Sequence, residues 1–276
     1  MGGRSQAMPV TPFQKDVARL LAPNRAPDSY LAGGAALHFQ PRSKRYSNDL
    51  EFFHNSEKRV ADAFAADRAV LEENGFRLVV QLAQPGYVRA VVEKGKDSTK
   101  IEWAHDSAWR FMPPVRSPEA GYVLHPVDLV VNKVLALAGR DEPRDFLDVL
   151  CAHEEMLSLG ALVWAAVGKD PGFTPLSLME LIKRRGHYHR EDFERLHLTE
   201  PVDPTVLKQT WLEALEQAER FVRSRPPEEL GCLYYSPGAR RFVTPGPESA
   251  SDVVIHFGRP GGVLPRLYAG DALAGG

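Results

Sequence analysis

Cysteine is scarce in this sequence, whose 276 residues include only Cys151 and Cys232. The two lie far apart, and neither belongs to a Cys-x-x-Cys pair or to the cysteine and histidine spacing of a zinc site. This scarcity argues against a disulfide framework and against structural zinc. It fits a reducing compartment, so we expect a cytoplasmic protein.

Long apolar runs and a surplus of one charge are also missing. No apolar run approaches the roughly eighteen residues of a membrane helix, and the N-terminus lacks the apolar core of a signal peptide. Lysine and arginine number 34 against 36 acidic residues, which gives a net charge of −2 and no overall attraction to nucleic acid. Any contact with RNA therefore depends on a local basic patch.

Helix and strand signals divide the chain into a mixed first half and a helical second half. We predict helices over 12–21, 56–74, 126–139, 142–157, 159–167 and 204–224, and strands over 76–82, 87–93 and 99–105. Proline-rich residues 106–124 are predicted to form a connecting loop. The expected class is α+β, with a mixed sheet and flanking helices over 1–124, a mainly helical domain over 125–224 and an irregular tail with a small hairpin over 225–276.

The stretch 30–53 carries the strongest chemical signal. Asp49 and Glu51 are separated by one residue and flanked by apolar residues, so the alternation of a strand places both carboxylates on one face. Two carboxylates that face one way repel each other unless a cation lies between them. Magnesium prefers one or two carboxylates together with substrate phosphates, so this strand is a candidate metal site.

A glycine pair precedes that strand. Gly33 and Gly34 lie where the chain is expected to turn from a strand into a helix, and without Cβ atoms they let the backbone approach a bulky anion. The N–H groups that open the helix would then point at a phosphate.

The order of these features resembles the nucleotidyltransferase superfamily, in which a glycine pair is followed about a dozen residues later by Asp-x-Asp or Asp-x-Glu. Here fourteen residues separate Gly34 from Asp49. The longer string formed by Arg45, Ser47, Asp49 and Glu51 is similar to that of the AbiEii-type abortive-infection nucleotidyltransferase toxins. The resemblance implies a nucleotidyltransferase-like core over 1–124, in which Arg45, Ser47 and the glycine pair bind nucleotide. The glutamate at position 51 departs mildly from the more usual second aspartate.

A third carboxylate is offered by the strand 99–105. Glu102 is predicted to point away from the apolar face, and it completes a metal-binding triad if its strand pairs with that of Asp49, as in many superfamily members. The alternative is a solvated glutamate on an edge strand, paired with Lys100.

A second constellation lies in the helical half. Lys133, Arg140, Arg144, Asp145 and Asp148 fall within sixteen residues. Their spacing also resembles the toxin family, which implies catalytic roles for Lys133 and Asp148 and nucleotide contacts for the other three, with this domain completing the active-site cleft. A lysine can neutralise triphosphate oxygens, and an arginine can bind phosphate in a bidentate manner. The alternative is that Lys133 and Arg140 cap a helix end and that Arg144 pairs with Asp148.

The densest basic cluster falls at 183–190, with Tyr188 inside it. It can hold an RNA backbone, or it can be a solvated junction between a helix and a loop.

The combined expectation is phosphoryl transfer from a nucleoside triphosphate. Asp49 and Glu51, with Glu102, would hold Mg²⁺ or Mn²⁺, and the resemblance implies an RNA acceptor such as the 3′ end of tRNA, a role as a toxin and a cognate antitoxin. No membrane is expected to take part. Two alternatives remain open: a catalytically silent module that binds nucleotide or a partner, and an enzyme that nucleotidylates a protein side chain.

Overall fold

The computed structural model describes residues 10–38, 45–47, 49–246 and 253–266. These residues belong to two compact units, which are described separately below. The first unit comprises Met1–Ala108, Pro113–Leu129 and Glu194–Pro201. The second comprises Trp109–Met112, Val130–Phe193 and Val202–Gly276.

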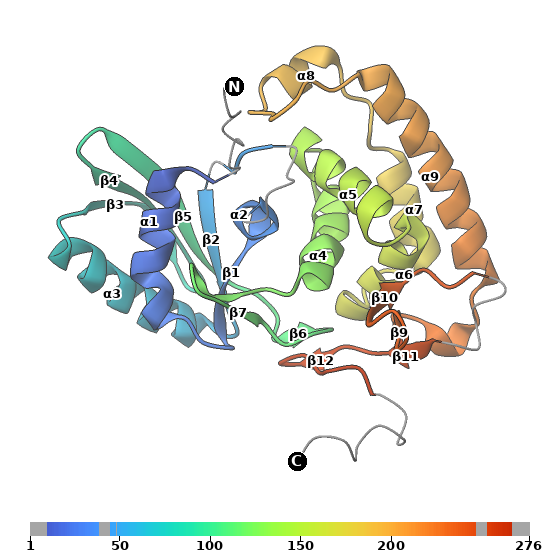
Figure 1. Ribbon diagram of the computed structural model, residues 1–276, viewed down its shortest axis with the longest axis horizontal. Coiled ribbons are helices and arrows are strands. Elements are labelled where there is room, and N and C mark those ends of the chain that lie inside the picture. The colour runs from blue at the N-terminus through green and yellow to red at the C-terminus, as the bar shows by residue number, and fades with distance from the viewer. Residues whose placement is uncertain (1–9, 39–44, 48, 247–252, 267–276) are drawn as a thin grey trace, which may run out of the picture. The chain divides into compact units, whose positions relative to one another are not determined.

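The first unit is built on a seven-stranded mixed sheet with strand order β3-β4-β5-β2-β1-β8-β7 (Figure 1). Its strands are β1 (Ser29–Ala32), β2 (Asp49–His54), β3 (Arg77–Gln84), β4 (Tyr87–Lys94), β5 (Asp97–His105), β7 (Val115–Ser117) and β8 (Gly121–Val123). The pairs β2–β5 and β1–β8 are parallel, and the others are antiparallel. The expected mixed sheet is confirmed.

Helices α1 (Pro12–Leu21) and α3 (Glu57–Glu73) cover one face of this sheet, whereas the short helix α2 (Gly33–His38) follows β1 directly. Thr11 and Ser56 cap α1 and α3 by accepting hydrogen bonds from backbone N–H groups of the first turn. Between helices and sheet lies an apolar core that includes the fully buried side chains of Leu50, Phe52, Ile101 and Trp103. Every second residue of β2 and β5 thus faces these helices.

The predicted loop at 106–124 is wrong in part, because the segment contains the three short strands β6 (Trp109–Arg110), β7 and β8. β8 pairs in parallel with β1 through Leu31 and Val123, so it extends the sheet beyond the glycine-pair strand. The prolines that suggested a loop lie between these strands or outside them. Strands of two or three residues owe their existence to a distant partner, which local composition does not reveal.

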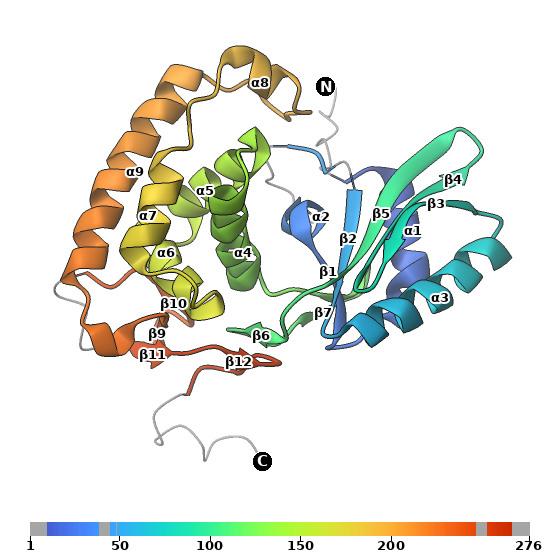
Figure 2. The same ribbon diagram turned by 180° about the vertical axis from the view of Figure 1, so that it is seen from behind.

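The second half of the chain is helical, as predicted. Its helices are α4 (Pro126–Gly139), α5 (Pro143–Glu155), α6 (Leu159–Lys169), α7 (Pro175–Lys183), α8 (Arg190–Glu194) and α9 (Pro204–Ser224). Residues 159–167 of α6 are all buried, because α5, α7 and α9 pack around this helix (Figure 2). The sequence patterns did not predict α7 and α8. None of the described helices is long and apolar enough to cross a membrane.

The C-terminal segment is more regular than predicted. Strands β9 (Leu233–Ser236), β10 (Arg241–Val243) and β11 (Val254–His256) form an antiparallel sheet in the order β10-β9-β11, and β12 (Arg259–Pro260) pairs with β6. The expected hairpin is present as β9–β10. Trp164 of α6 donates a hydrogen bond to the carbonyl oxygen of Glu229 at 2.7 Å, and Cys232 is fully buried. Described residues of this segment therefore pack as part of the second unit.

Candidate active site

Four charged side chains leave the sheet of the first unit on the same face. In the parallel register of β2 and β5, Asp49 is opposite Lys100 and Glu51 is opposite Glu102. Their neighbours along each strand face the other way, and Trp103 meets Phe64 of α3 with ring centroids 5.2 Å apart. The charged face is therefore the one turned away from α1 and α3.

Lys100 lies between two of these carboxylates. Its Nζ is 2.8 Å from Oδ2 of Asp49 and 3.1 Å from Oε1 of Glu102. Arg89 of β4 also donates to Oε1 of Glu102, at 3.0 Å. Burial lowers the pKa of Lys100, but its hydrogen bonds and charge interactions with the two carboxylates outweigh burial and raise the pKa above its usual value.

The two expectations for Glu102 are both met in part. Its strand does pair with the strand of Asp49, so the carboxylates of the predicted triad share one face. Glu102 also pairs with Lys100, but β5 lies inside the sheet rather than at its edge, and the Glu102 side chain is only 13% exposed.

The glycine pair packs directly against Glu51. The N–H of Gly34 donates to Oε2 of Glu51 at 3.1 Å. Gly33 has φ +62°, and a Cβ atom there would lie 1.6 Å from the same oxygen. In this structure the start of α2 thus positions a carboxylate of β2, and the predicted phosphate contact of the glycine pair stays a prediction.

Arg45 and Ser47 lie just before the first residue of β2. The Ser47 hydroxyl donates to the carbonyl oxygen of Asp49 at 3.0 Å. Arg45 is 6% exposed and donates through Nη1 to the carbonyl oxygen of Tyr46 at 3.2 Å. A Cβ atom on Gly34 would lie 3.2 Å from both Arg45 Nη2 and Ser47 Oγ. The motif residues are therefore brought together around the glycine pair.

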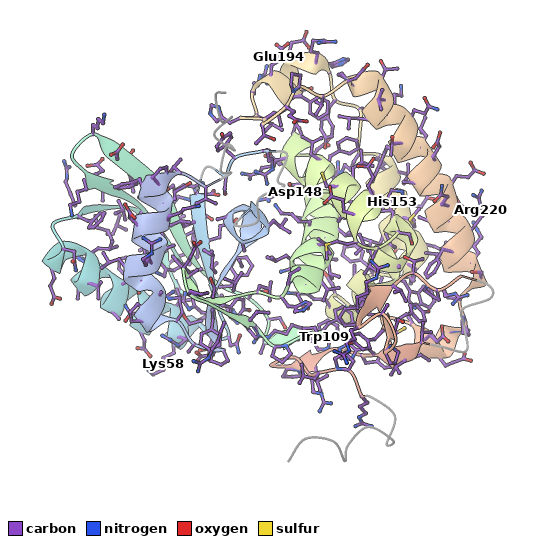
Figure 3. All side chains as sticks on the ribbon, in the orientation of Figure 1. Lys58, Trp109, Asp148, His153, Glu194 and Arg220 are labelled. Carbon is purple, nitrogen blue, oxygen red and sulfur yellow. The ribbon has the colours of Figure 1, made fainter. Side chains whose placement is uncertain are left out.

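The second unit holds a lysine between two carboxylates as well. Lys133 of α4 donates to Oδ1 of Asp145 at 2.8 Å and lies 2.9 Å from Oδ2 of Asp148, both on α5 (Figure 3 labels Asp148). Arg140 donates to Oδ2 of Asp145 at 2.7 Å. Burial raises the pKa of Asp145, but Lys133 and Arg140 outweigh it and hold the pKa below the usual range.

The structural alternative for these residues is not the arrangement observed. Asp148 pairs with Lys133, whereas Arg144 lies 3.9 Å from Glu142. The carbonyl oxygens at the end of α4 are capped by Arg185, which donates to Leu137 and Ala138 at 3.1 and 2.8 Å. Lys133 is thus part of a buried charge cluster within the unit.

The basic cluster at 183–190 divides into two sets. Lys183 pairs with Glu180 and Glu219, both at 2.9 Å, and Arg185 caps α4, so these two cations support the fold. Tyr188 donates its hydroxyl to Asp141 at 2.6 Å. The exposed members are Arg184, His187, His189 and Arg190.

Sequence reasoning named Lys100 only as a partner of Glu102, and it missed both the contact of Lys100 with Asp49 and the presence of Arg89. The alternation that placed Glu102 away from the core also places Lys100 on the same face, so a signal for Lys100 was present. Arg89 had none, because its neighbourhood follows from the antiparallel register of β4 and β5.

The donor set fits a hard divalent cation. Asp49 and Glu102 converge on a single positive charge, and carboxylate oxygens are the ligands that magnesium and manganese prefer. In the part of the chain that the structure describes, no three histidine, cysteine or acidic side chains come together as a ready metal site. A divalent cation held by these carboxylates would complete its shell with water or substrate oxygens.

The fold and the site thus define a mixed-sheet protein with paired carboxylates beside a glycine turn and a lysine–aspartate cluster on two helices. A family profile described as "Nucleotidyl transferase AbiEii toxin, Type IV TA system" matches residues 16–230. The chain belongs to this family of nucleotidyltransferase toxins from toxin–antitoxin systems.

The chain is also similar to solved structures. MenT4, a nucleotidyltransferase toxin from Mycobacterium tuberculosis H37Rv, is 17% identical, with a TM-score of 0.48, and the match covers 82% of this chain and 88% of that one. JHP933 from Helicobacter pylori is 17% identical with a TM-score of 0.45, over 76% of this chain and 90% of that one. None of the curated proteins matches the sequence.

Proposed function

We propose that the protein transfers a nucleoside monophosphate from a nucleoside triphosphate to a hydroxyl group of RNA, with the 3′ end of tRNA as the preferred acceptor, and that Mg²⁺ or Mn²⁺ is required. One observation carries the proposal. Asp49 and Glu102 lie on two strands paired in register, and both carboxylates contact the ammonium group of Lys100. Membership of the toxin family supports the reaction class.

Asp49 and Glu102, with Glu51 next to Asp49 on the same face of the sheet, would hold the metal together with water or substrate oxygens. When bound, the ion lowers the pKa of the acceptor hydroxyl and neutralises charge on the leaving pyrophosphate. Gly33 and Gly34 set the position of Glu51, since one leaves space for its carboxylate and the other donates to it. Preorganised carboxylates of this kind avoid the cost of gathering negative charge during the reaction.

Lys133, Arg140 and Arg144 would bind phosphate oxygens of the nucleotide. Lysine acts there as a point charge and arginine as a planar donor. Asp145 and Asp148 hold Lys133 in one orientation, at 2.8 and 2.9 Å. Their role in the proposed reaction is to keep this cation placed until the triphosphate competes for it.

The proposed RNA acceptor, the antitoxin and the cellular compartment are inferred from the family, not from contacts within the structure. A net charge of −2 leaves RNA binding to local groups, and the exposed Arg184, His187, His189 and Arg190 supply such a patch. A toxin of a toxin–antitoxin system implies a cognate antitoxin that restrains it. Nucleoside triphosphates and tRNA are cytoplasmic, so we place the activity there.

The test uses purified protein, Mg²⁺, each α-labelled nucleoside triphosphate and total bacterial RNA. Label should enter RNA, and Asp49→Asn should reduce its rate by at least about 100-fold, because the metal loses a ligand. Asp62→Asn makes the same change on the exposed face of α3 and should leave the rate intact. Label in protein would identify a protein acceptor instead, and no label in either, with every donor, would favour the silent module.

A second variant tests the helical residues. Lys133→Met should lower the rate of label transfer by about 100- to 1,000-fold, as expected for loss of a cation that stabilises the transferring phosphoryl group. Lys169→Met at the end of α6 removes the same charge away from the cluster and serves as the control. An unchanged rate in Lys133→Met would remove this cluster from the mechanism.

A further inference from the structure

We infer that Lys100 occupies the position of the metal ion in the metal-free protein, and that it must leave when the ion enters, so that metal and nucleotide each strengthen the binding of the other. The inference rests on the function proposed above. It assigns Lys100 a positioning and regulatory role at the carboxylates, beyond that of a surface ion-pair partner.

The distances place one cation where another is needed. Lys100 Nζ lies 2.8 Å from Asp49 Oδ2 and 3.1 Å from Glu102 Oε1, so it bridges the two carboxylates. A magnesium ion bound to both oxygens would sit about 2.0–2.1 Å from each. An ammonium and a divalent ion cannot share that space, because their charges repel and their radii overlap.

The lysine side chain is more exposed and more flexible than the two carboxylates that it contacts. The Asp49 and Glu102 side chains are 10% and 13% exposed, whereas that of Lys100 is 34% exposed on a flexible four-carbon stem. Glu102 also accepts a hydrogen bond from Arg89 at 3.0 Å, a contact that does not involve Lys100. The carboxylates can therefore stay in place while the lysine moves.

The displaced ammonium needs a new partner. A triphosphate that arrives with the metal offers anionic oxygens within reach of the same face of the sheet, so it can receive Lys100 as the ion takes the carboxylates. A metal alone must displace the lysine into water with no such compensation. Binding of metal and nucleotide is consequently coupled, with each raising the affinity of the other.

The experiment measures Mn²⁺ binding at fixed pH through the electron paramagnetic resonance signal of the free ion, with and without a non-hydrolysable nucleoside triphosphate analogue. The wild type should bind Mn²⁺ weakly alone and at least about tenfold more tightly with the analogue. Lys100→Gln should bind Mn²⁺ alone at least about tenfold more tightly than the wild type, because the competing charge is gone. The gain from the analogue should then be smaller than in the wild type, because only the direct phosphate ligands contribute to it.

Two further variants isolate the position of the charge. Lys94→Gln removes the same charge from the far end of β4, where Lys94 donates to the carbonyl oxygen of Asn74, and should behave as the wild type. Lys100→Arg keeps the charge and should keep weak binding of Mn²⁺ alone. Circular dichroism and thermal unfolding confirm that each variant is folded.

The outcomes separate the inference from the function on which it rests. Equal Mn²⁺ affinity in the wild type and Lys100→Gln, or wild-type binding that the analogue does not strengthen, overturns the role of Lys100 while leaving the metal site intact. If neither protein binds Mn²⁺ even with the analogue, the proposed metal site itself fails. Should Lys100→Gln not fold, wild-type binding that the analogue does not strengthen still overturns the inference.

Discussion

At Gly33, two separate requirements exclude a side chain. Its φ of +62° is a left-handed conformation that residues with a Cβ rarely adopt, and a Cβ there would lie 1.6 Å from Glu51 Oε2. The first requirement concerns the backbone, and the second concerns a carboxylate of the proposed metal site. Substitution at this position should therefore affect both stability and chemistry.

Gly33→Ala should displace the Glu51 carboxylate and reduce label transfer at least about tenfold, with a backbone cost of about 1–2 kcal/mol. Gly75→Ala is the matched control, since Gly75 has φ +77° with no atom within 4 Å of its Cβ position. It should show the backbone cost alone in urea unfolding and full transfer activity. Equal activity in the two variants would separate Glu51 from the reaction.

His54 should make the stability of the protein depend on pH. It is fully buried in β2, and desolvation, with the positive charges of Arg25 and Arg59, lowers its pKa to about 3. In the unfolded chain the pKa returns to about 6.5, so between these values the unfolded state binds a proton that the folded state does not. Stability from this residue is complete above pH 6.5 and is lost as the pH falls toward 3.

The free energy of unfolding should therefore drop by about 2 kcal/mol more between pH 7 and pH 5 in the wild type than in His54→Leu. Leucine fills a similar volume and does not titrate. Urea unfolding at several pH values gives both slopes, and the comparison cancels the contributions of other histidines. Parallel slopes would mean that His54 is solvated or paired in the folded state.

At the scale of elements, helix α3 is tied to the sheet by a buried carboxylate. Asp67 accepts hydrogen bonds from Trp103 Nε1 at 2.7 Å, Arg25 Nη2 at 2.6 Å and Asn24 Nδ2 at 2.8 Å. The Arg25 and Asp67 side chains are both fully buried. Removing one partner leaves the other charge uncompensated in the core.

Asp67→Ala should destabilise the protein by about 3–5 kcal/mol, because Arg25 remains buried without its counter-ion. Asp62→Ala on the same helix removes an exposed i,i+4 partner of Lys58 and should cost no more than about 0.5 kcal/mol. Chemical unfolding of both variants gives the difference. A small effect of Asp67→Ala would show that Arg25 finds another partner or water.

Several elements were predictable because their ends carry local signals. The helices at 12–21 and 204–224 begin with proline after a capping residue, and their predicted and observed bounds agree. Helix α7 was missed although it begins with the same signals, a capping Thr174 followed by Pro175. The five-residue helix α8 and the three short strands within 106–124 were not predicted, since so few residues carry little periodicity. Their formation depends on partners that are distant in sequence, such as β1 for β8.

The residues of the candidate site also differ in how far local sequence predicts them. Alternation predicted that Asp49 and Glu51 share a face, and one further pairing was enough to bring in Glu102. The pairing of Lys100 with Glu102 was one of the sequence alternatives, but its contact with Asp49 was not foreseen, because that contact follows from the register that sets Lys100 opposite Asp49. Register is a tertiary property, fixed by which side chains the whole sheet buries.

On the scale of the whole molecule, the same charge motif occurs in each unit. Lys100 lies between Asp49 and Glu102 in the first, and Lys133 lies between Asp145 and Asp148 in the second. Each lysine is already paired, so a phosphate group that approaches either cluster competes with carboxylates for the cation. Under the proposed function, a metal ion at the first cluster would release Lys100, which would link cation dependence to nucleotide affinity.

The segment after residue 224 packs against helix α6, so it is not an irregular tail. Gly168 of α6 lies against Gly231, and a Cβ on Gly168 would be 2.3 Å from the Gly231 carbonyl oxygen. In an open helix, replacing glycine by alanine stabilises by roughly 0.5–1 kcal/mol. Here the backbone of Gly231 fills the space that the new methyl group would need, so alanine should destabilise the protein instead of stabilising it.

Gly168→Ala should therefore destabilise the protein by about 1–3 kcal/mol, because the two backbones must separate. Gly238→Ala, in a turn with no atom within 4 Å of the Cβ position, should change stability by less than about 0.5 kcal/mol. Thermal unfolding, with limited proteolysis near Gly231, follows both the whole protein and this contact. Stabilisation by Gly168→Ala would mean that the segment after α9 does not pack on α6, and the second unit would then end with its helices.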